Sequence, residues 1–485
     1  MKAHQDMLIC LLYLASYVTA QDNCPYKVCL CTGSDIDCGN LAMTEMPQLS
    51  TKINLYSPSL HIEDNQIITV PAGSLPANLT EIFLDNNPVL SIDNSAFDIT
   101  ATTLQTVSFD NARFTRIPDV LLHVTSLLTF TLANTNIQDW NDDVMKHIGR
   151  TVTTLQLDDV GLTQWPPWMQ YFIKLSDLTI TNSAISNISD NGLISMADTL
   201  ESLSLTSNSL TSVPKALTRL NTLQMLYLHD NDITDIQWLS QVGKLYSLSL
   251  NNNQISCAST LSQALHTFAD SLYDLQIHHN ALTEIPDMSF LHGLTSLDLS
   301  YNEISDAISG SLPPELFSLN LEDNGLPYFP KYISKLTAVT DFIANTNAFT
   351  MLVGSAWPPE TVTTELAYNL ITELTDASFP ENSKIQNLNL NDNPIYQIST
   401  SAFKNLPHLT VLDLRRTKLT RLPVALASLT NLTSFDISGT RGVVCTCAEN
   451  SVAPVILSMK RENVKGECGP TNIYKFFTTF SSSCP

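Results

Sequence analysis

The chain has 485 residues, which is too many for one ordinary hydrophobic core. Only 15% of the residues are charged and only 15 are glycine, so the composition excludes a disordered chain. The net charge of −23 excludes nucleic acid as an expected partner, because a negative surface repels a polyanion.

The first twenty residues have the pattern of a secretory signal peptide. Lys2 and His4 precede an apolar run from Met7 to Val18, and small residues stand before Gln21. The run is too short to span a membrane, and no apolar run of spanning length follows it. We therefore expect cleavage after Ala20 and secretion into the extracellular space.

Apart from Cys10 in that segment and an isolated Cys257, the cysteines gather in two groups. In a secreted chain such groups are normally disulfides, because a small terminal unit buries too little apolar surface to be stable alone. Zinc is the competing interpretation, but thiolate metal sites favour reducing surroundings, so we expect no metal. The groups are Cys24, Cys29, Cys31 and Cys38, and Cys445, Cys447, Cys468 and Cys484.

Between the two groups the sequence repeats. LESLSLTSNSL from Leu200 and LTSLDLSYNEI from Leu294 share apolar residues at positions 1, 4, 6 and 11 and asparagine at position 9. This is the leucine-rich repeat pattern, and it predicts a short strand around position 4 with one apolar face. Seventeen copies begin at Ser57, Leu79, Leu104, Leu127, Val152, Leu175, Leu200, Leu223, Leu245, Leu272, Leu294, Leu316, Val339, Thr361, Ile385, Leu409 and Leu432.

One copy cannot bury its apolar face, so we expect the copies to stack into a parallel sheet with a continuous core. The asparagine at position 9 is expected to bond backbone groups at the bend after the strand. Four successive copies lack it, and weaker local stacking is predicted there. Their position-9 residues are Ala112, Thr135, Val160 and Ser183.

The segments that return from one strand to the next differ between copies. Those of the copies beginning at Leu79, Leu127 and Leu175 have a helical pattern, as does STLSQALHTFA after Cys257. Pro118, Pro166 and Pro214 oppose a regular helix in the intervening copies. Wide returns outside thin strands predict curvature, with the strands on the concave face.

The repeats and cysteine groups resemble those of extracellular leucine-rich-repeat proteins with cysteine-rich caps, a group that includes Slit, chondroadherin, Toll ectodomains and variable lymphocyte receptors. The resemblance covers Cys24 to Cys484, although GVVCTCAEN lacks the Asn-Pro and the tryptophan-bearing helix common in the second cap. It implies an α/β solenoid, a leucine-rich-repeat horseshoe with a parallel concave β-sheet, about 17 repeats and disulfide caps at both ends. The implied pairs are Cys24–Cys31, Cys29–Cys38, Cys445–Cys468 and Cys447–Cys484.

The expected domains follow from the same pattern. They are a signal peptide (1–20), an N-terminal cysteine-rich cap (21–56), the repeats (57–442) and a C-terminal cysteine-rich cap (443–485).

Positions 2, 3, 5, 7 and 8 are expected to point out of the concave sheet. Acidic residues recur at these positions in most copies, and only Arg415 and Arg416 oppose them. The acids are consistent with solubility alone or with a cationic partner. Basic residues outnumber acidic residues from Ser401 onward. This end is therefore expected either to bind acidic glycans or to be simply solvated. Four of its basic residues lie within one copy: Arg415, Arg416, Lys418 and Arg421.

Aromatic residues and histidines gather at the same outward positions in five consecutive copies. Exposed aromatic side chains are typical anchors of protein interfaces, whereas scattered exposed tyrosines are the plainer interpretation. His278 and His279 do not predict a metal site, because His229 lies two copies away. The predicted binding patch consists of Tyr227, His229, Tyr246, Tyr273, His278, His279, Tyr301 and Phe317.

No motif of a catalytic site is present. The sequence has no nucleophile elbow and no HExxH, and its paired carboxylates follow the repeat, so we expect no enzymatic activity and no cofactor. Cys257 is either a buried thiol or the link in a disulfide-bonded homodimer. Asn78, Asn187 and Asn431 begin glycosylation sequons.

The sequence thus predicts a secreted, non-enzymatic glycoprotein that recognises a protein partner on its concave face, in the extracellular matrix, adhesion or signalling. The alternatives are an innate-immune protein that binds microbial surfaces and a self-assembling structural protein of the matrix.

Overall fold

The computed structural model describes residues 24–50 and 58–479. The predicted signal peptide and Cys484 lie outside these residues. The chain forms two compact units. Unit 1 extends to Asp232 and includes residues 241–243, and unit 2 comprises residues 233–240 and the chain from Lys244 onward.

Unit 1 contains the first eight predicted copies, and each of them forms a strand that begins at position 3. Position 4 is buried in every strand, and successive strands pair in parallel with position 4 opposite position 4, as Leu60 lies opposite Ile82. The strands are β3 (Ser59–His61), β5 (Glu81–Phe83), β7 (Thr106–Asp110), β8 (Thr129–Ala133), β9 (Thr154–Asp158), β10 (Asp177–Thr181), β11 (Ser202–Ser204) and β12 (Met225–Tyr227).

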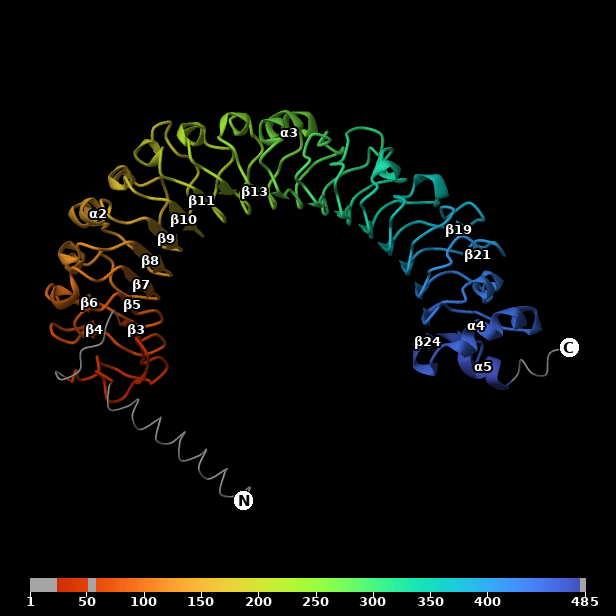
Figure 1. The fold of residues 1–485 in the computed structure, drawn as a ribbon, viewed down its shortest axis with the longest axis horizontal. Helices are drawn as coiled ribbons and strands as arrows, with labels where there is room; N and C mark the ends of the chain where they lie inside the picture. Colours follow the sequence, from red (N-terminus) through yellow and green to blue (C-terminus); the bar gives the residue numbers. More distant parts are fainter. Residues whose placement is uncertain (1–23, 51–57, 480–485) are drawn as a thin grey trace, which may run out of the picture. The chain divides into compact units, whose positions relative to one another are not determined.

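Unit 2 contains the remaining copies, again with one parallel strand each. The strands are β13 (Ser247–Ser249), β14 (Asp274–Gln276), β15 (Ser296–Asp298), β16 (Ser318–Asn320), β17 (Asp341–Ile343), β18 (Thr363–Glu365), β20 (Asn387–Asn389), β22 (Val411–Asp413) and β23 (Ser434–Asp436). The predicted repeat register is therefore confirmed in all copies. In each unit the strands line the inner side of the curved ribbon and the return segments line the outer side (Figure 1).

The return segments match the predictions only in part. The copy from Leu127 contains α2 (Asp142–Ile148), and the helix predicted after Cys257 is α3 (Ala258–Leu265), followed by the 3-10 helix η7 (His266–Phe268). The copies from Leu79 and Leu175 contain the three-residue 3-10 helices η1 (Asp98–Thr100) and η4 (Ile194–Met196) in place of an α-helix, so the helical prediction is met there only in part.

The return segment of the copy from Leu79 contains threonines that bond outside the segment. The hydroxyl groups of Thr100 and Thr103 both donate to the carbonyl of Leu79, at 2.6 and 2.9 Å. Threonine is β-branched and its hydroxyl competes for backbone partners, and both properties disfavour a regular helix.

The prolines act as expected, because no α-helix contains them. Pro118, Pro166 and Pro214 each precede a five-residue 3-10 helix. These three helices are η2 (Asp119–His123), η3 (Pro167–Tyr171) and η5 (Lys215–Arg219). Other 3-10 helices of the return segments are η6 (Leu239–Gln241), η8 (Ile333–Lys335), η9 (Gly354–Ala356) and η10 (Val424–Ser428). Two pairs of short parallel strands also lie in return segments: β4 (Thr69–Val70) pairs with β6 (Ser91–Ile92), and β19 (Glu373–Leu374) pairs with β21 (Gln397–Ile398).

The asparagines at position 9 connect each copy to the one before it. Asn369 is typical: its Oδ1 accepts from the amide of Phe349 at 3.1 Å, and its Nδ2 donates to the carbonyl of Ala344 at 3.0 Å. Both partners belong to the preceding copy and are buried. One side chain therefore satisfies a donor and an acceptor that the end of the previous strand leaves unpaired.

The four successive copies of unit 1 without this asparagine form longer strands. β7, β8, β9 and β10 have five residues, and pairing continues to positions 6 and 7, as Ala133 lies opposite Asp158. Backbone pairing thus extends where the side chain is missing, and the weaker stacking stays a prediction that hydrogen exchange tests. Thr135 also supplies part of the bonding, because its hydroxyl accepts from the amide of Ala112 at 3.1 Å.

Position 8 is where the chain turns away from the strand. Its φ lies between 46° and 56° in every copy except the last, where Gly439 has a φ of 74°. This left-handed conformation suits Gly, Asn and Asp and costs other residues roughly 1–2 kcal/mol. Unit 1 has Asn, Asp or one serine at position 8, whereas unit 2 also has His279, Tyr301, Thr346, Tyr368 and Arg416.

The N-terminal end of unit 1 is closed by an antiparallel hairpin of β1 (Leu30–Thr32) and β2 (Asp35–Asp37). β2 continues the sheet by pairing with β3, and the disulfides Cys24–Cys31 and Cys29–Cys38 hold the hairpin. The hydroxyl of the buried Tyr26 donates to the carbonyl of Ser74 at 2.5 Å, and burial raises the pKa of Tyr26.

The C-terminal end of unit 2 is closed by helices and short strands. β24 (Val464–Lys465) pairs with β23, and Cys445–Cys468 is a disulfide. A capping box of Thr446 and Glu449 begins η11, so a helical part is present despite the atypical sequence. The elements are η11 (Cys447–Val452), α4 (Ala453–Ser458), η12 (Arg461–Asn463), β25 (Glu467–Cys468), β26 (Thr471–Asn472) and α5 (Ile473–Thr479).

Within residues 24–50 and 58–479, no helix is long and apolar enough to cross a membrane.

The asparagine bonds should dominate local stability. We expect Asn369→Ala to lower the free energy of unfolding by about 3 kcal/mol, because one buried amide and one buried carbonyl lose their partner. Chemical unfolding monitored by circular dichroism measures the change. The exposed Asn191 is the matched control, and equal stability of Asn369→Ala and Asn191→Ala would contradict the role of the position-9 bonds.

Candidate functional site

The outward side chains of the strands form one surface in each unit. Position 4 is buried in the core, so the neighbouring positions 3 and 5 point to the opposite side of the sheet. We call the surface made by positions 2, 3, 5, 7 and 8 the strand face. This surface is open, and it carries the residues that the sequence analysis predicts to bind a partner.

Two tyrosines stack before the strands of unit 2. Tyr246 and Tyr273 occupy position 2 of successive copies, with ring centroids 5.2 Å apart and an interplanar angle of 29°. Their exposed fractions are 55% and 53%. Tyr273 also lies over Gly293, where an added Cβ would be 2.9 Å from the tyrosine Cε1. The missing side chain of Gly293 therefore makes room for the ring.

A second stack lies after the strands. His279 and Tyr301 occupy position 8 of the copies from Leu272 and Leu294, with ring centroids 4.1 Å apart and an interplanar angle of 16°. The Nδ1 atoms of His278 and His279 are 2.8 Å apart, so the neighbouring histidine fixes the orientation of this ring. Tyr301 is 43% exposed although its ring is stacked.

The structure therefore divides the predicted patch. In unit 2 it forms a tyrosine stack on one side of the strands and a histidine–tyrosine stack on the other, with the exposed Phe317 at position 2. Tyr227 and His229 belong to unit 1, where Tyr227 is half-buried on β12 and the His229 Nδ1 lies 2.7 Å from a carboxylate oxygen of Asp230.

Acidic residues lie between the two stacks and beyond them. The copies from Leu272 to Thr361 have no Lys or Arg on the strand face. Burial raises the pKa of Glu322, and the charges of Asp323, Asp298 and Glu365 raise it further. The strand-face acids of these copies are Asp274, Asp298, Glu322, Asp323, Asp341 and Glu365.

Three arginines near the C-terminal end are paired with carboxylates within the chain. Arg415 Nη2 lies 2.6 Å from Asp413, and Arg416 Nε donates to Asp392 at 2.6 Å. Arg421 pairs with the buried Glu449 at 2.6 Å. The sequence shows how many basic residues this end contains but not that three arginines are already paired. The acidic-glycan site stays a prediction, and three of its arginines already have partners within the chain.

One residue of the strand face escaped the sequence analysis. Tyr368 stands at position 8 of the weakly matching copy from Thr361, and it is 56% exposed. Its hydroxyl bonds to Asp392, which lowers the pKa of that carboxyl in addition to the larger effect of Arg416. The repeat register could have found it, because Asn369 marks position 9 directly after it.

Cys257 is exposed and carries a free thiol, so the expectation of a buried thiol is wrong. It stands at the N-cap of α3, and its Sγ lies 3.3 Å from the hydroxyl of Ser259 and 3.0 Å from that of Thr260. These hydrogen bonds favour the thiolate and lower the pKa of Cys257 to about 7.

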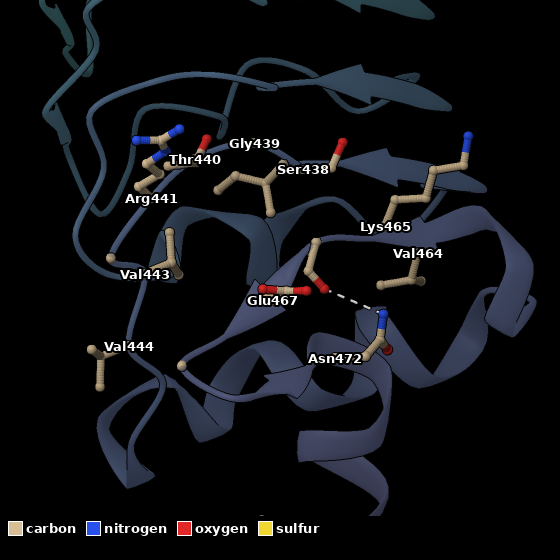
Figure 2. A pocket seen from close by; sticks show the side chains of 14 residues that line it. Ser438, Gly439, Thr440, Arg441, Val443, Val444, Val464, Lys465, Glu467 and Asn472 are labelled. Carbon is tan, nitrogen blue, oxygen red and sulfur yellow. Dashed lines mark hydrogen bonds between the residues drawn. The ribbon is translucent and has the colours of Figure 1, made fainter.

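A cavity of about 630 Å³ lies at the C-terminal end of unit 2 (Figure 2). It is lined by residues 437–444 and 464–467 with Gly469 and Asn472, and Lys465 reaches Asp436 at 3.9 Å. Asn472 donates to the carbonyl of Gly466 at 3.2 Å. In the described part of the chain, no three His, Cys, Asp or Glu residues are placed to hold a metal ion.

Comparisons with known proteins agree with the repeats and the fold. The family model described as leucine rich repeat matches residues 173–233, 198–255, 270–326 and 383–441. A search of curated proteins gave no match.

Solved structures are similar at low sequence identity. The mouse RP105/MD-1 complex matches with a TM-score of 0.60 and 18% identity over 88% of this chain and 75% of the other. A leucine-rich-repeat protein of Leptospira interrogans matches with a TM-score of 0.55 and 20% identity, over 71% of this chain and 92% of the other. YopM from Yersinia enterocolitica matches with a TM-score of 0.53 and 19% identity, over 89% of this chain and 92% of the other. The chain is a leucine-rich-repeat protein with disulfide-bonded caps near both ends.

Proposed function

We propose that this chain is a secreted, non-enzymatic protein that binds a protein partner on the strand face of unit 2. The observation that carries the proposal is the pair of exposed aromatic stacks, Tyr246 with Tyr273 and His279 with Tyr301. Aromatic side chains bury much apolar area at little entropic cost, and they dominate the energetics of protein interfaces. Stacking holds these rings in place before a partner arrives.

The open strand face supports binding rather than catalysis. A catalytic site needs a place that excludes water and positions a nucleophile, a base and an oxyanion donor together. The strand face of unit 2 offers flat, repeating side chains instead. We therefore propose no enzymatic activity and no cofactor.

Secretion is proposed on the disulfides near both ends and on the signal-like residues 1–20. Asn78, Asn187 and Asn431 are exposed, as glycosylation requires. None of the three lies between Leu245 and Leu316, so glycans on them would leave both stacks accessible. The structural neighbour RP105 is itself solved in a complex with another protein, MD-1.

Replacement of the position-2 aromatics should weaken capture of a partner. We expect the triple variant Tyr246→Ala, Tyr273→Ala and Phe317→Ala to lose at least about 2 kcal/mol of binding, roughly a thirtyfold loss of affinity, because exposed anchors lose their contact area. The measurement is affinity capture by the glycosylated, secreted protein, followed by titration of the captured partner.

Tyr328 and Tyr396 provide the matched control, because they are similarly exposed (47% and 57%) but lie in return segments. The Tyr328→Ala and Tyr396→Ala double variant should bind as the unchanged protein does. Equal loss in both variants, or no loss in the triple variant, would contradict binding on the strand face. Capture of bacterial glycans alone would favour the microbial-surface alternative, and concentration-dependent light scattering without a partner would favour self-assembly.

The thiol of Cys257 should react at neutral pH. Its alkylation rate should reach half of its plateau near pH 7, because the pKa is about 7. In the Ser259→Ala and Thr260→Ala double variant the midpoint should move toward the ordinary thiol value of about 8.5, since both hydroxyl donors are lost. Rates of iodoacetamide labelling measure the midpoint, and an unchanged midpoint would refute the role of the hydroxyl groups.

An exposed thiol that ionises near neutral pH can form a disulfide with a second chain, and this predicts a testable disulfide-linked homodimer of the secreted protein. A covalent dimer on non-reducing electrophoresis that Cys257→Ser removes would establish it. A band at monomer size only would exclude it.

A further inference from the structure

The strand-face acids of unit 2 fall into two groups that differ in their partners. In the copies from Ile385 to Leu432 the chain supplies its own cations: Asp392 pairs with Arg416, Asp413 with Arg415, and Asp436 lies 3.9 Å from Lys465. In the copies from Leu272 to Thr361, none of the strand-face carboxylates forms an ion pair with Lys or Arg in the part of the chain that the structure describes. We call these copies the acidic strip; its carboxylates are Asp274, Asp298, Glu322, Asp323, Asp341 and Glu365.

Neutral groups orient the carboxylates of the acidic strip without neutralising them. Ser247 donates its hydroxyl to Asp274 at 2.7 Å, and the amide of Ser300 donates to Asp298 at 2.8 Å. Asn389 donates to Glu365 at 2.5 Å. The charges are therefore held in place on an open surface, and their mutual repulsion is left uncompensated.

The mutual repulsion of these carboxylates is clearest in the pKa of Glu322. Burial raises its pKa, and Asp323, Asp298 and Glu365 add to the effect. A carboxyl whose pKa is raised in the fold makes the native state less stable once it ionises, so at neutral pH this acid works against folding. Nothing in the surrounding copies requires a charge there, because other copies carry Ser300 or Asn345 at the same position.

The backbone of the acidic strip is also unfavourable at position 8. Tyr301 and Tyr368 have φ values of 53° and 54°, where asparagine or aspartate is preferred and is found in unit 1. A bulky residue in this conformation marks strain that function can explain. A large part of each side chain still faces solvent, although Tyr301 stacks on His279 and the Tyr368 hydroxyl bonds to Asp392.

Aromatic rings and carboxylates occur together at positions 7 and 8 of the acidic strip. The amide of Tyr301 donates to the carbonyl of Glu322 at 2.9 Å, so the backbones of these two residues are paired on adjacent copies. An arginine side chain is long enough to pair with Glu322 and also to contact an aromatic ring on an adjacent copy, a cation–π contact that arginine favours.

We propose that the acidic strip binds a basic segment of the protein partner, with arginine or lysine side chains at the carboxylates and against the position-8 rings. This inference rests on the proposed function and specifies the chemistry of the partner. The carboxylates from Asp298 to Glu365 lie on four adjacent strands, which span roughly 14 Å at the usual strand spacing. That distance corresponds to about four residues of extended chain. The spread also suits several cations better than one metal ion, for which no cluster exists among the described residues.

The direct test measures binding of a fluorescent peptide of alternating arginine and glycine to the full secreted protein, with a citrulline peptide as the uncharged probe. The strip variant Asp298→Asn, Glu322→Gln and Glu365→Gln should weaken binding of the arginine peptide at least tenfold and flatten its salt dependence. The control variant Glu63→Gln, Asp85→Asn and Asp110→Asn makes the same charge change on the strand face of unit 1. Its affinity should change less than twofold.

Equal losses in the two triple variants would overturn the proposal, because they would indicate attraction to net charge alone. So would an unchanged strip variant, or a citrulline peptide that binds as tightly as the arginine peptide.

Tyr301→Asn separates a binding role from a structural one. Asparagine is suited to the left-handed conformation, so we expect the melting temperature to rise by about 2 °C while the affinity for the arginine peptide falls about fivefold. A lower melting temperature with lower affinity would indicate a structural residue, and unchanged affinity would remove the ring from the site.

The same variants distinguish this inference from the proposed function. A captured partner that is lost with the position-2 aromatic variant but retained by the strip variant would refute the basic segment and leave binding on the strand face intact. A partner retained by both variants would refute both.

Discussion

The hydrogen bonds of position 9 are the constraint on which the rest of the structure depends. A three-residue strand that turns at once leaves an amide and a carbonyl of each copy without a partner. The asparagine of the following copy satisfies both, as Asn369 does for Phe349 and Ala344. Because the bond joins neighbouring copies, it fixes the turn, which in turn places positions 7 and 8 at the edge of the strand face.

The exceptions show that the bonds matter rather than the asparagine itself. In β7 to β10 two more residues join the sheet, and near the C-terminal end Thr440 accepts from the amide of Thr417 at 3.1 Å. Of these two places that lack the position-9 asparagine, the sequence analysis identifies only the one in β7 to β10. Backbone pairing replaces the side chain in β7 to β10, and the Thr440 hydroxyl replaces it for Thr417.

The periodicity of the sequence predicted the features that are set within a single copy, namely the strands, their buried residues and the outward positions. Contacts between copies lie more than twenty residues apart, so periodicity could not pair Arg416 with Asp392 or stack His279 on Tyr301. Side-chain direction decided the exposure of Cys257, and the return after Leu79 contains only a three-residue 3-10 helix. These outcomes require the three-dimensional structure, whereas the three disulfides within the described residues were implied by the resemblance.

Unit 2 retains bulky position-8 residues and uncompensated acids that lower the stability of the fold, and partner binding gives these features a physical reason. The most direct measurement is amide hydrogen exchange of the secreted protein with and without its captured partner. Our account predicts slower exchange at positions 7 and 8 of the acidic strip, including the Tyr301 amide, with unchanged exchange in the return segments. Protection confined to return segments, or to unit 1, would contradict it.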